Sequence, residues 1–388
     1  MIALAPLVEA GTELTTAELE RYSRHVIIPE IGIIGQRRLK NARVLVVGAG
    51  GLGAPVLLYL AAAGVGTLGI IDDDVVDLSN LQRQVIHGVA DVGFSKLESA
   101  RAAVTALNPM VSIRLHPVRL DSTNALALFA DYDLIIDGSD NFATRYLVND
   151  AAALLAKPCV WGSIYRFDGQ VSVFWAKHGP TYRDLYPEAP PAGSSPSCGE
   201  GGVFGMLCGV IGSIMVAESV KLITGVGRTL LGRVALFNAL EGSWRELGLT
   251  PDSAAAAITE LVDYDLFCGT SARSEVAEDG ISVRELAAML DEREQGTRDF
   301  DLIDVREPGE YDIVHIRGAR LVPQGSILTG VALPTLSRDR DIVLHCKAGP
   351  RSADVLAELR RLGYSRVKQL EGGVLAWVQE IDPSLPVY

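Results

Sequence analysis

The chain has 388 residues, of which 48% are hydrophobic and 21% are charged, and its formal net charge at pH 7 is −13. Such a length and composition predict a folded enzyme of two or three domains. The acidic balance argues against general nucleic-acid binding, which depends on contacts between Lys or Arg side chains and phosphates.

No targeting or membrane-spanning segment is expected. Residues 1–16 lack the basic start and the continuous apolar core of a signal peptide. The longest apolar run, residues 202–223, is interrupted by several glycines, Glu218 and Lys221, which favours a buried helix over a membrane span. The cysteines, five in number, show no metal-type spacing, so we expect reactive thiols in a reducing cytoplasm.

Helix and strand patterns alternate through the first part of the chain. A helical entry segment over residues 12–40 comes first, and a short apolar strand over 42–47 follows. The next elements, in chain order, are a strand at 67–71, a helix at 95–107, a strand at 111–118, a helix at 122–130, a strand at 132–136, a helix at 141–156 and a strand at 158–162. This alternation predicts a parallel sheet with helical crossovers, and residues 169–175 and 231–240 add later strands whose direction is left open.

The hydrophobic pattern changes over residues 251–280, which we interpret as a linker. Beyond it the alternation restarts, with helices expected at 282–294, 351–362 and 373–380 and strands at 301–304, 341–345 and 366–370. The sequence therefore predicts two α/β domains, one over residues 14–250 and a smaller one over residues 281–388.

A glycine-rich turn joins the first strand to its helix. Gly48, Gly50 and Gly53 follow the pattern G-x-G-x-x-G, which allows a tight turn and lets backbone amides approach a phosphate. Asp72 ends the second strand, where an acidic side chain can hold ribose hydroxyls. The pattern alone does not choose between NAD and ATP, so an NAD-dependent oxidoreductase must be considered.

Charged and amide side chains further along favour ATP. Asn80 and Arg83 lie in an N-L-Q-R-Q motif, Lys96 opens the next helix, and Asp140 begins a D-N-x-x-x-R motif. A hydride-transfer site has little need for such groups around a phosphate, whereas an adenylating site does. Arg83 and Lys96 can neutralise charge on the α-phosphate and pyrophosphate, and Asp140 can hold Mg²⁺.

Together with the motif R-Y-S-R at residues 21–24, these motifs resemble the ThiF family, which includes the molybdopterin-synthase adenylyltransferases, over about residues 14–250. The resemblance implies a Rossmann-like adenylation domain with a mixed sheet. It also implies roles for individual residues: Gly51 lines the nucleotide phosphates, Asp72 binds ribose, Asn80, Arg83 and Lys96 contact phosphates, and Asp140 holds magnesium.

The same resemblance implies the partners. Arg24 would reach the nucleotide site of a neighbouring subunit, so a two-fold homodimer is implied. The substrate would be a small ubiquitin-like sulfur carrier that ends in Gly-Gly. Its terminal carboxylate would attack the α-phosphate of ATP and give an acyl adenylate and pyrophosphate.

One departure from the resembled family concerns zinc. Many members carry a structural zinc site made from two C-x-x-C pairs. The corresponding places here are residues 181–184, which have no cysteine, and residues 265–268, which have one. Because a structural zinc needs four ligands, we predict no zinc at this site.

The second domain contains a cysteine suited to sulfur chemistry. Cys346 follows an apolar strand and precedes a helix, so the backbone amides of residues 347–351 can surround its sulfur. Lys347 and Arg351 add positive charge, and such a setting stabilises a nucleophilic thiolate or a persulfide anion.

Motifs around Cys346 resemble the rhodanese family over about residues 281–385. They are D-V-R-E-x-x-E-Y from Asp304, H-I-x-G-A from His315, the Cys346 loop itself, and G-G-x-x-A-W from Gly372. The resemblance implies a sulfurtransferase whose donor, thiosulfate or the persulfide of a cysteine desulfurase, is left open.

Cys198 lies in a Pro/Gly/Ser-rich stretch, residues 186–202, that predicts a loop beyond the nucleotide site. In the resembled family a cysteine here is a candidate for a covalent relay, and a bystander thiol is the alternative. We expect sulfur from Cys346, directly or through Cys198, to displace AMP from the adenylate and yield a thiocarboxylate.

Two other interpretations stay open, as does the pathway. The second domain could only dock partners, or the chain could be an NAD-dependent oxidoreductase with an appended domain. Molybdopterin biosynthesis is one of several pathways, thiamin and tRNA thiolation among them, that could receive the sulfur.

Overall fold

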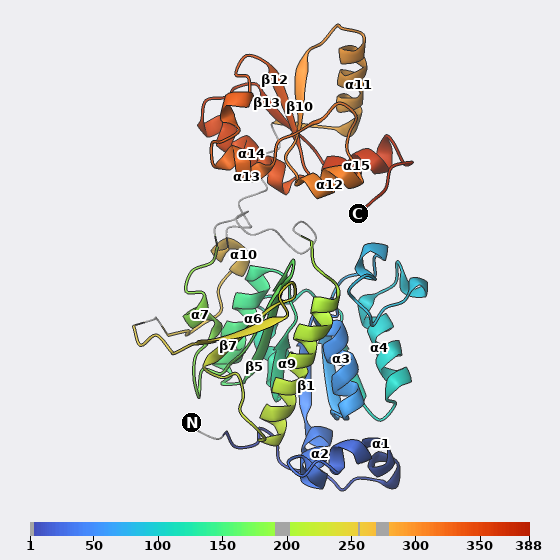
Figure 1. Ribbon diagram of the computed structural model, residues 1–388, viewed down its shortest axis with the longest axis vertical. Coiled ribbons are helices and arrows are strands. Elements are labelled where there is room, and N and C mark those ends of the chain that lie inside the picture. The colour runs from blue at the N-terminus through green and yellow to red at the C-terminus, as the bar shows by residue number, and fades with distance from the viewer. Residues whose placement is uncertain (1–3, 191–201, 255–256, 269–278) are drawn as a thin grey trace. The chain divides into compact units, whose positions relative to one another are not determined.

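The computed structural model describes residues 4–190, 202–254, 257–268 and 279–388, which fold as two compact α/β units (Figure 1). The first unit extends to Cys268, and the described part of the second begins at residue 279. The expected fold class, a larger domain with a mixed sheet followed by a smaller α/β domain, is confirmed.

The first unit is built on an eight-stranded sheet with the order β3-β2-β1-β4-β5-β6-β7-β8. Its strands are β1 (Arg43–Val47), β2 (Thr67–Ile71), β3 (Ser112–His116), β4 (Leu134–Asp137), β5 (Cys159–Tyr165), β6 (Asp168–Phe174), β7 (Arg233–Asn238) and β8 (Ser243–Gly248). Strands β1 to β5 pair in parallel, whereas β6, β7 and β8 are antiparallel to their neighbours. The two later strands that the sequence predicted are therefore antiparallel additions.

The helices of this unit are α1 (Thr16–Val26), α2 (Gly32–Asn41), α3 (Gly53–Ala63), α4 (Lys96–Leu107), α5 (Ala125–Ala130), α6 (Phe142–Leu154), α7 (Tyr182–Leu185), α9 (Met206–Thr224) and α10 (Tyr264–Phe267). The entry segment expected as one helical stretch forms two helices, α1 and α2. Thr15 begins α1 with a capping box that Glu18 completes. Pro29 lies in the turn that separates the two helices, where its missing N–H costs no helical hydrogen bond.

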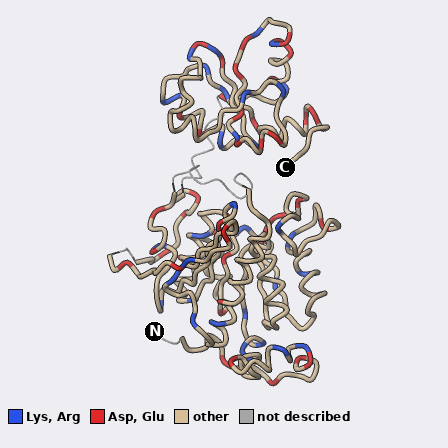
Figure 2. The backbone as a smooth tube through the Cα atoms, viewed as in Figure 1, with Lys and Arg blue, Asp and Glu red and all other residues tan. Residues whose placement is uncertain are grey.

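Two hydrophobic clusters cover the two faces of the sheet. One contains buried residues of α3, α4 and α9, and the other contains buried residues of α5, α6, α7 and α10. Helix α3 carries no charged residue and is drawn wholly in tan in Figure 2, as expected for a core helix. By length and apolarity alone α9 could cross a membrane, but half of its most apolar window is buried inside the unit.

Part of the expected linker packs into the first unit. Tyr264 and Cys268, on and just after α10, are buried with residues of α6 and β5 in one hydrophobic cluster. The first unit therefore continues to Cys268, beyond residue 250, where we placed the end of the domain.

The second unit has a five-stranded parallel sheet with the order β11-β10-β12-β13-β9. Its strands are β9 (Gly280–Ile281), β10 (Phe300–Asp304), β11 (Arg320–Leu321), β12 (Asp341–His345) and β13 (Val367–Leu370), and its helices are α11 (Val283–Glu294), α12 (Pro308–Ile313), α13 (Gln324–Leu328), α14 (Pro350–Arg361) and α15 (Gly373–Glu380). A hydrophobic cluster covers each face of this sheet, and β12 at its centre ends directly before Cys346.

Candidate functional site

The glycine turn lies where the carboxyl ends of β1 and β4 meet. Gly48 has a φ of +91°, and a Cβ there would lie 3.3 Å from the carbonyl oxygen of Gly138. A Cβ on Gly53 would overlap the carbonyl oxygen of Gly48. Only glycine satisfies both positions, and the turn leads directly into the N-terminus of α3, the kind of helix start at which phosphates bind in proteins.

Asp72 connects the end of β2 to this turn. Its Oδ2 accepts a hydrogen bond from the Ala49 amide at 2.8 Å, and its Oδ1 accepts one from the Asp74 amide at 2.9 Å. Burial raises the pKa of Asp72. A carboxylate has about four acceptor sites, so each oxygen of Asp72 can still accept a hydrogen bond from a ribose hydroxyl.

Arg83 and Lys96 approach the same edge from two directions. Gly51 lies between Arg83 and Cys208, because a Cβ on Gly51 would be 3.7 Å from Arg83 Cγ and 2.8 Å from the Cys208 sulfur. The buried Lys96 extends its ammonium to Asp74 Oδ2 at 2.7 Å. The Arg83 guanidinium donates to the Ser79 carbonyl oxygen at 3.0 Å, so Arg83 lies beside the turn through its side-chain carbons.

Asn80 and Asp140 are the remaining residues that the sequence predicted for the nucleotide site of this chain. Asn80 ends the short 3₁₀ turn Leu78–Asn80, and its Oδ1 accepts from the Asp77 amide at 3.3 Å. Asp140 is exposed two residues after Gly138. An exposed carboxylate near the glycine turn would suit Mg²⁺, which usually takes one or two carboxylates, phosphate oxygens and waters.

A chain of hydrogen-bonded polar groups contacts the glycine turn at the Ala49 carbonyl oxygen. No motif in the sequence predicted this chain. His87 Nε2 lies 3.0 Å from the Ala49 carbonyl oxygen, and His87 Nδ1 lies 2.8 Å from Ser99 Oγ. Ser99 in turn donates to Asp91 at 2.8 Å. Burial lowers the pKa of His87, and its two ring nitrogens join the turn to Ser99 on α4.

Arg24 is not at the nucleotide edge of its own chain. It is exposed on α1, where the neighbouring Arg21 donates to the carbonyl oxygen of Leu107 at 3.0 Å. Leu107 ends α4, and Lys96 begins it, so about 16 Å of helix separates α1 from the nucleotide edge. Cys198 lies outside the described residues.

In the second unit, the Cys346 sulfur lies in the turn between β12 and α14. The Gly349 amide donates to it at 3.1 Å, and Ser352 Oγ lies 3.6 Å away. Gly349 has a φ of +121°, a conformation that favours glycine. The turn is also held from behind, because the Val374 amide donates to the Cys346 carbonyl oxygen at 2.9 Å.

Lys347 lies in the same turn and Arg351 lies in the first turn of α14, each beside a defined partner. Arg351 forms two hydrogen bonds of 2.7 Å with the two carboxylate oxygens of Glu310, on α12. Lys347 Nζ lies 4.4 Å from the ring centre of Tyr388. His345 is fully buried on the strand, and burial lowers its pKa to about 4, so it stays neutral near pH 7 and is a poor general base.

An ion pair occupies the place where the resembled family holds zinc. Arg183 Nη2 contacts the buried Asp150 Oδ2 at 2.7 Å, and the Tyr264 hydroxyl donates to the same oxygen at 2.6 Å. The Arg183 guanidinium also lies 4.9 Å from the Phe267 ring centre. Burial raises the pKa of Cys268 and disfavours the thiolate that zinc requires. A guanidinium and one protonated thiol do not fit a zinc ion.

Comparison with known families agrees with this division. Residues 22–256 match the ThiF family, and residues 282–380 match the rhodanese-like domain.

Several relatives share both domains or the first alone. The chain is 56% identical over 393 residues to a probable adenylyltransferase/sulfurtransferase MoeZ of Mycobacterium tuberculosis, covering 100% of this chain and 99% of that protein. It is 40% identical over 397 residues to the adenylyltransferase and sulfurtransferase MOCS3 of Drosophila ananassae, covering 97% and 87%. A sulfur carrier protein adenylyltransferase of Thermus thermophilus is 52% identical over 266 residues, covering 66% of this chain and 98% of that protein.

Solved structures resemble the first unit in fold. The crystal structure of E. coli MccB with MccA-N7isoASN has a TM-score of 0.56 and 21% sequence identity, and it covers 62% of this chain and 75% of that one. At this identity the likeness concerns the fold alone.

Proposed function

The chain belongs to the ThiF family and carries a rhodanese-like domain, and we propose that it couples ATP-dependent activation of a small sulfur-carrier protein to sulfur transfer from Cys346. It is an adenylyltransferase and a sulfurtransferase, as are its relatives over the whole chain.

The hydrogen bond that joins Asp72 to the glycine turn supports the adenylation half. Asp72 is suited to the ribose, and Arg83 and Lys96 are assigned to the phosphates. The carrier's C-terminal carboxylate attacks the α-phosphate, the bond to the β-phosphate oxygen breaks, and pyrophosphate leaves. The two cations stabilise the charge that develops on both phosphate groups. Mg²⁺ held by Asp140 would neutralise further phosphate charge.

The Cys346 turn supports the sulfur half, because a backbone amide donates to the sulfur, Lys347 lies in the turn and Arg351, paired with Glu310, begins the helix that follows. The donor, thiosulfate or the persulfide of a cysteine desulfurase, leaves a persulfide on Cys346. The terminal persulfide sulfur attacks the acyl carbon of the adenylate, and AMP leaves with the electron pair of the broken bond.

The resulting acyl disulfide still needs a thiol to release the product. Attack of a thiolate on the Cys346 sulfur frees the carrier thiocarboxylate and leaves a disulfide on the enzyme, which a cellular dithiol then reduces. We propose Cys198 as that thiol. The carrier is expected to end in Gly-Gly, the compartment to be the cytoplasm, and molybdopterin biosynthesis to be one candidate pathway.

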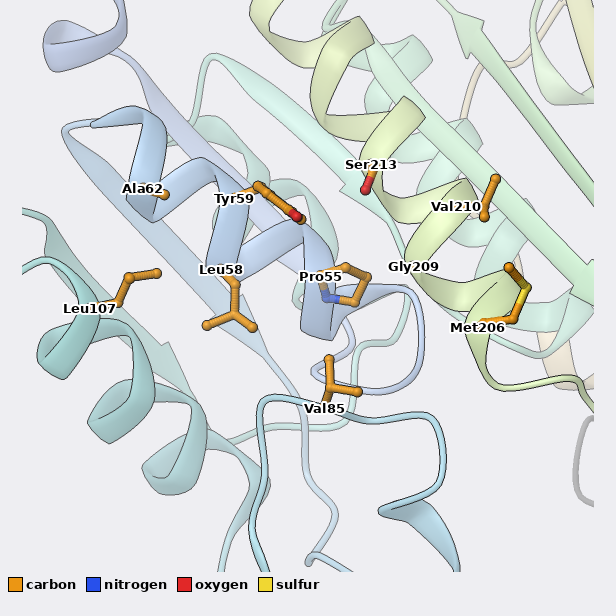
Figure 3. Close-up of a pocket in the computed structure, with 10 residues that line it drawn as sticks. All are labelled: Pro55, Leu58, Tyr59, Ala62, Val85, Leu107, Met206, Gly209, Val210 and Ser213. Atoms are coloured by element: carbon orange, nitrogen blue, oxygen red, sulfur yellow. The ribbon is translucent and has the colours of Figure 1, made fainter. Parts of the chain in front are cut away.

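An exposed apolar groove supports a homodimer. Figure 3 shows residues of α3 and α9 that line it. Its volume is about 640 Å³, and its walls are mainly apolar. Tyr59, Val85 and Met206 line it with 58%, 64% and 51% of their surfaces exposed. We propose that a second copy of the chain covers this groove and that its Arg24 reaches the nucleotide site, since Arg24 is remote from that site in its own chain.

The test is ATP–pyrophosphate exchange with the full chain and a panel of small β-grasp carriers that end in Gly-Gly. We expect exchange that requires a carrier and disappears when the carrier's last glycine is deleted. Tight NAD binding with no exchange for any carrier would instead support an oxidoreductase and overturn the proposed adenylation.

A further inference from the structure

Tyr388 lies beside the Cys346 turn although no sequence motif points to it. The neighbouring Pro386 and Val387 are exposed, whereas the Tyr388 side chain is partly buried among charged groups. Its ring contacts Lys347, and its hydroxyl contacts Glu310, the carboxylate that pairs with Arg351.

The Tyr388 hydroxyl connects two buried charges. Arg306 Nη1 donates to it at 2.6 Å, and it donates to Glu310 Oε1 at 2.8 Å. Burial raises the pKa of Tyr388, so the hydroxyl keeps the proton that it donates. Burial opposes ionisation of Glu310, but the hydrogen bonds from Arg351 hold the pKa of Glu310 below its ordinary value. The carboxylate that orients Arg351 is therefore itself oriented by Tyr388.

The Tyr388 ring faces the second cation. Lys347 Nζ lies 4.4 Å from the ring centre, within the range of a cation–π interaction. The backbone of Lys347 is fixed separately, because the Leu375 amide donates to its carbonyl oxygen at 3.1 Å. The ring thus restricts the long Lys347 side chain, and the Lys347 backbone is already held next to Cys346.

We infer that Tyr388 is a positioning residue of the Cys346 site, which holds Lys347 and Arg351 in place and thereby strengthens the approach of a small anionic reagent to the sulfur. The inference rests on the proposed function, in which Cys346 accepts sulfur from a donor. Two ordered cations attract an anion more strongly than two mobile ones, because the ordering entropy is already lost before binding.

Tyr364 offers a matched control in the same unit. The Arg338 guanidinium lies 4.5 Å from its ring centre, and its hydroxyl lies 3.4 Å from the carbonyl oxygens of Leu333 and Leu336. A Tyr364→Phe variant removes a tyrosine hydroxyl from a comparable setting that does not involve Lys347 or Arg351. Any general effect on folding should appear in both variants.

The first experiment compares alkylation of Cys346 by iodoacetate, an anion, and by iodoacetamide, which is neutral. Mass spectrometry of the Cys346 peptide gives both rates in the full chain. The iodoacetate-to-iodoacetamide ratio is expected to fall roughly three- to tenfold in Tyr388→Leu, because the cation–π contact and the hydroxyl are both lost. Tyr388→Phe, which keeps the ring, should show a smaller fall, and Tyr364→Phe should match the wild type.

The second experiment measures transfer from thiosulfate to cyanide. The outer sulfur of thiosulfate bonds to the Cys346 thiolate and sulfite leaves, and cyanide then removes that sulfur as thiocyanate and restores the thiolate. For Tyr388→Leu we expect the KM for thiosulfate to rise roughly three- to tenfold, with kcat changed less than KM.

The outcomes separate the inference from the proposed function. Tyr388 variants with an unchanged alkylation ratio, or a lower kcat with the wild-type KM, would indicate a purely structural residue and overturn the inference alone. A wild-type Cys346 that reacts with neither alkylating reagent nor thiosulfate would overturn both the inference and the proposed role of Cys346.

Discussion

The carboxylate of Asp72 accepts a hydrogen bond from the backbone amide of Ala49, with 2.8 Å between Oδ2 and the nitrogen. This bond joins the end of β2 to the turn that follows β1. The group suited to the ribose and the turn suited to the phosphates are therefore held as one rigid edge.

Replacement of Asp72 tests this edge. Hydrogen bonds to a charged acceptor contribute about 1.5–3 kcal/mol, so Asp72→Ala should raise the KM for ATP by roughly 10- to 100-fold in carrier-dependent exchange. Asp73→Asn, at the exposed neighbouring position, is the control and should change KM little.

Because burial raises the pKa of Asp72 above its ordinary 3.8, acidification should protonate Asp72 at a higher pH than an ordinary aspartate. ATP affinity should accordingly fall as the pH is lowered, and a pH-independent KM would contradict this.

Lys96 should act on the chemical step. Removal of one preorganised charge from a developing anion typically costs about 10²–10³ in kcat, so Lys96→Ala should slow pyrophosphate exchange by that factor. Arg101→Ala, also on α4 but exposed and paired with Glu98, should retain nearly full activity. Equal loss in the two variants would mean that the helix, and not the ammonium of Lys96, is responsible.

Most of the framework could be predicted because its elements carry long apolar runs. Strand β4 is buried throughout and β1 is buried after its first residue, so their sequences predict strands without alternation. The edge strand β8 was missed because nearly all of its residues are exposed, and β9 and β11 have two residues each. Such elements depend on pairing with the sheet, which a local pattern does not encode.

The site was predictable where residues act through fixed spacing along one strand-turn-helix unit, as Gly48 and Gly53 do. His87 and Tyr388 were not predicted because their partners are distant in sequence. His87 contacts Ala49 and Ser99. Tyr388 contacts Arg306 and Glu310. Only the folded chain brings these groups together, and no motif spacing records the contact.

We expect the ion pair of Asp150 and Arg183 to hold α10 in place without a metal ion. Asp150→Asn leaves the partly buried Arg183 guanidinium without its charge partner, and because Arg183 keeps some contact with water the cost should lie below the about 3–5 kcal/mol of a fully buried pair. We therefore expect a clearly lower melting temperature for Asp150→Asn, and no change in the wild type on addition of a chelator. Stoichiometric zinc in the purified protein, or unfolding by the chelator, would contradict this prediction.

Cys346→Ser should separate the two activities. Carrier-dependent pyrophosphate exchange should stay within about twofold of the wild type, since adenylation does not use the thiol, whereas thiocarboxylate formation should be lost. Cys208→Ser is the control because Cys208 is buried beside Gly51 in the first unit. Mass spectrometry of the carrier measures the product. Undiminished thiocarboxylate from Cys346→Ser would favour a second domain that only docks partners.

Subunit mixing tests whether Arg24 acts across a dimer. Arg24→Ala and Lys96→Ala should each be weakly active alone. A mixed dimer, however, has one site that combines an intact Lys96 from one chain with an intact Arg24 from the other. Random exchange makes about half of the dimers mixed, each with one of two sites restored, so activity should recover to about a quarter of the wild type. If Arg24 served its own chain, each mixed dimer would hold two impaired sites and no activity would return.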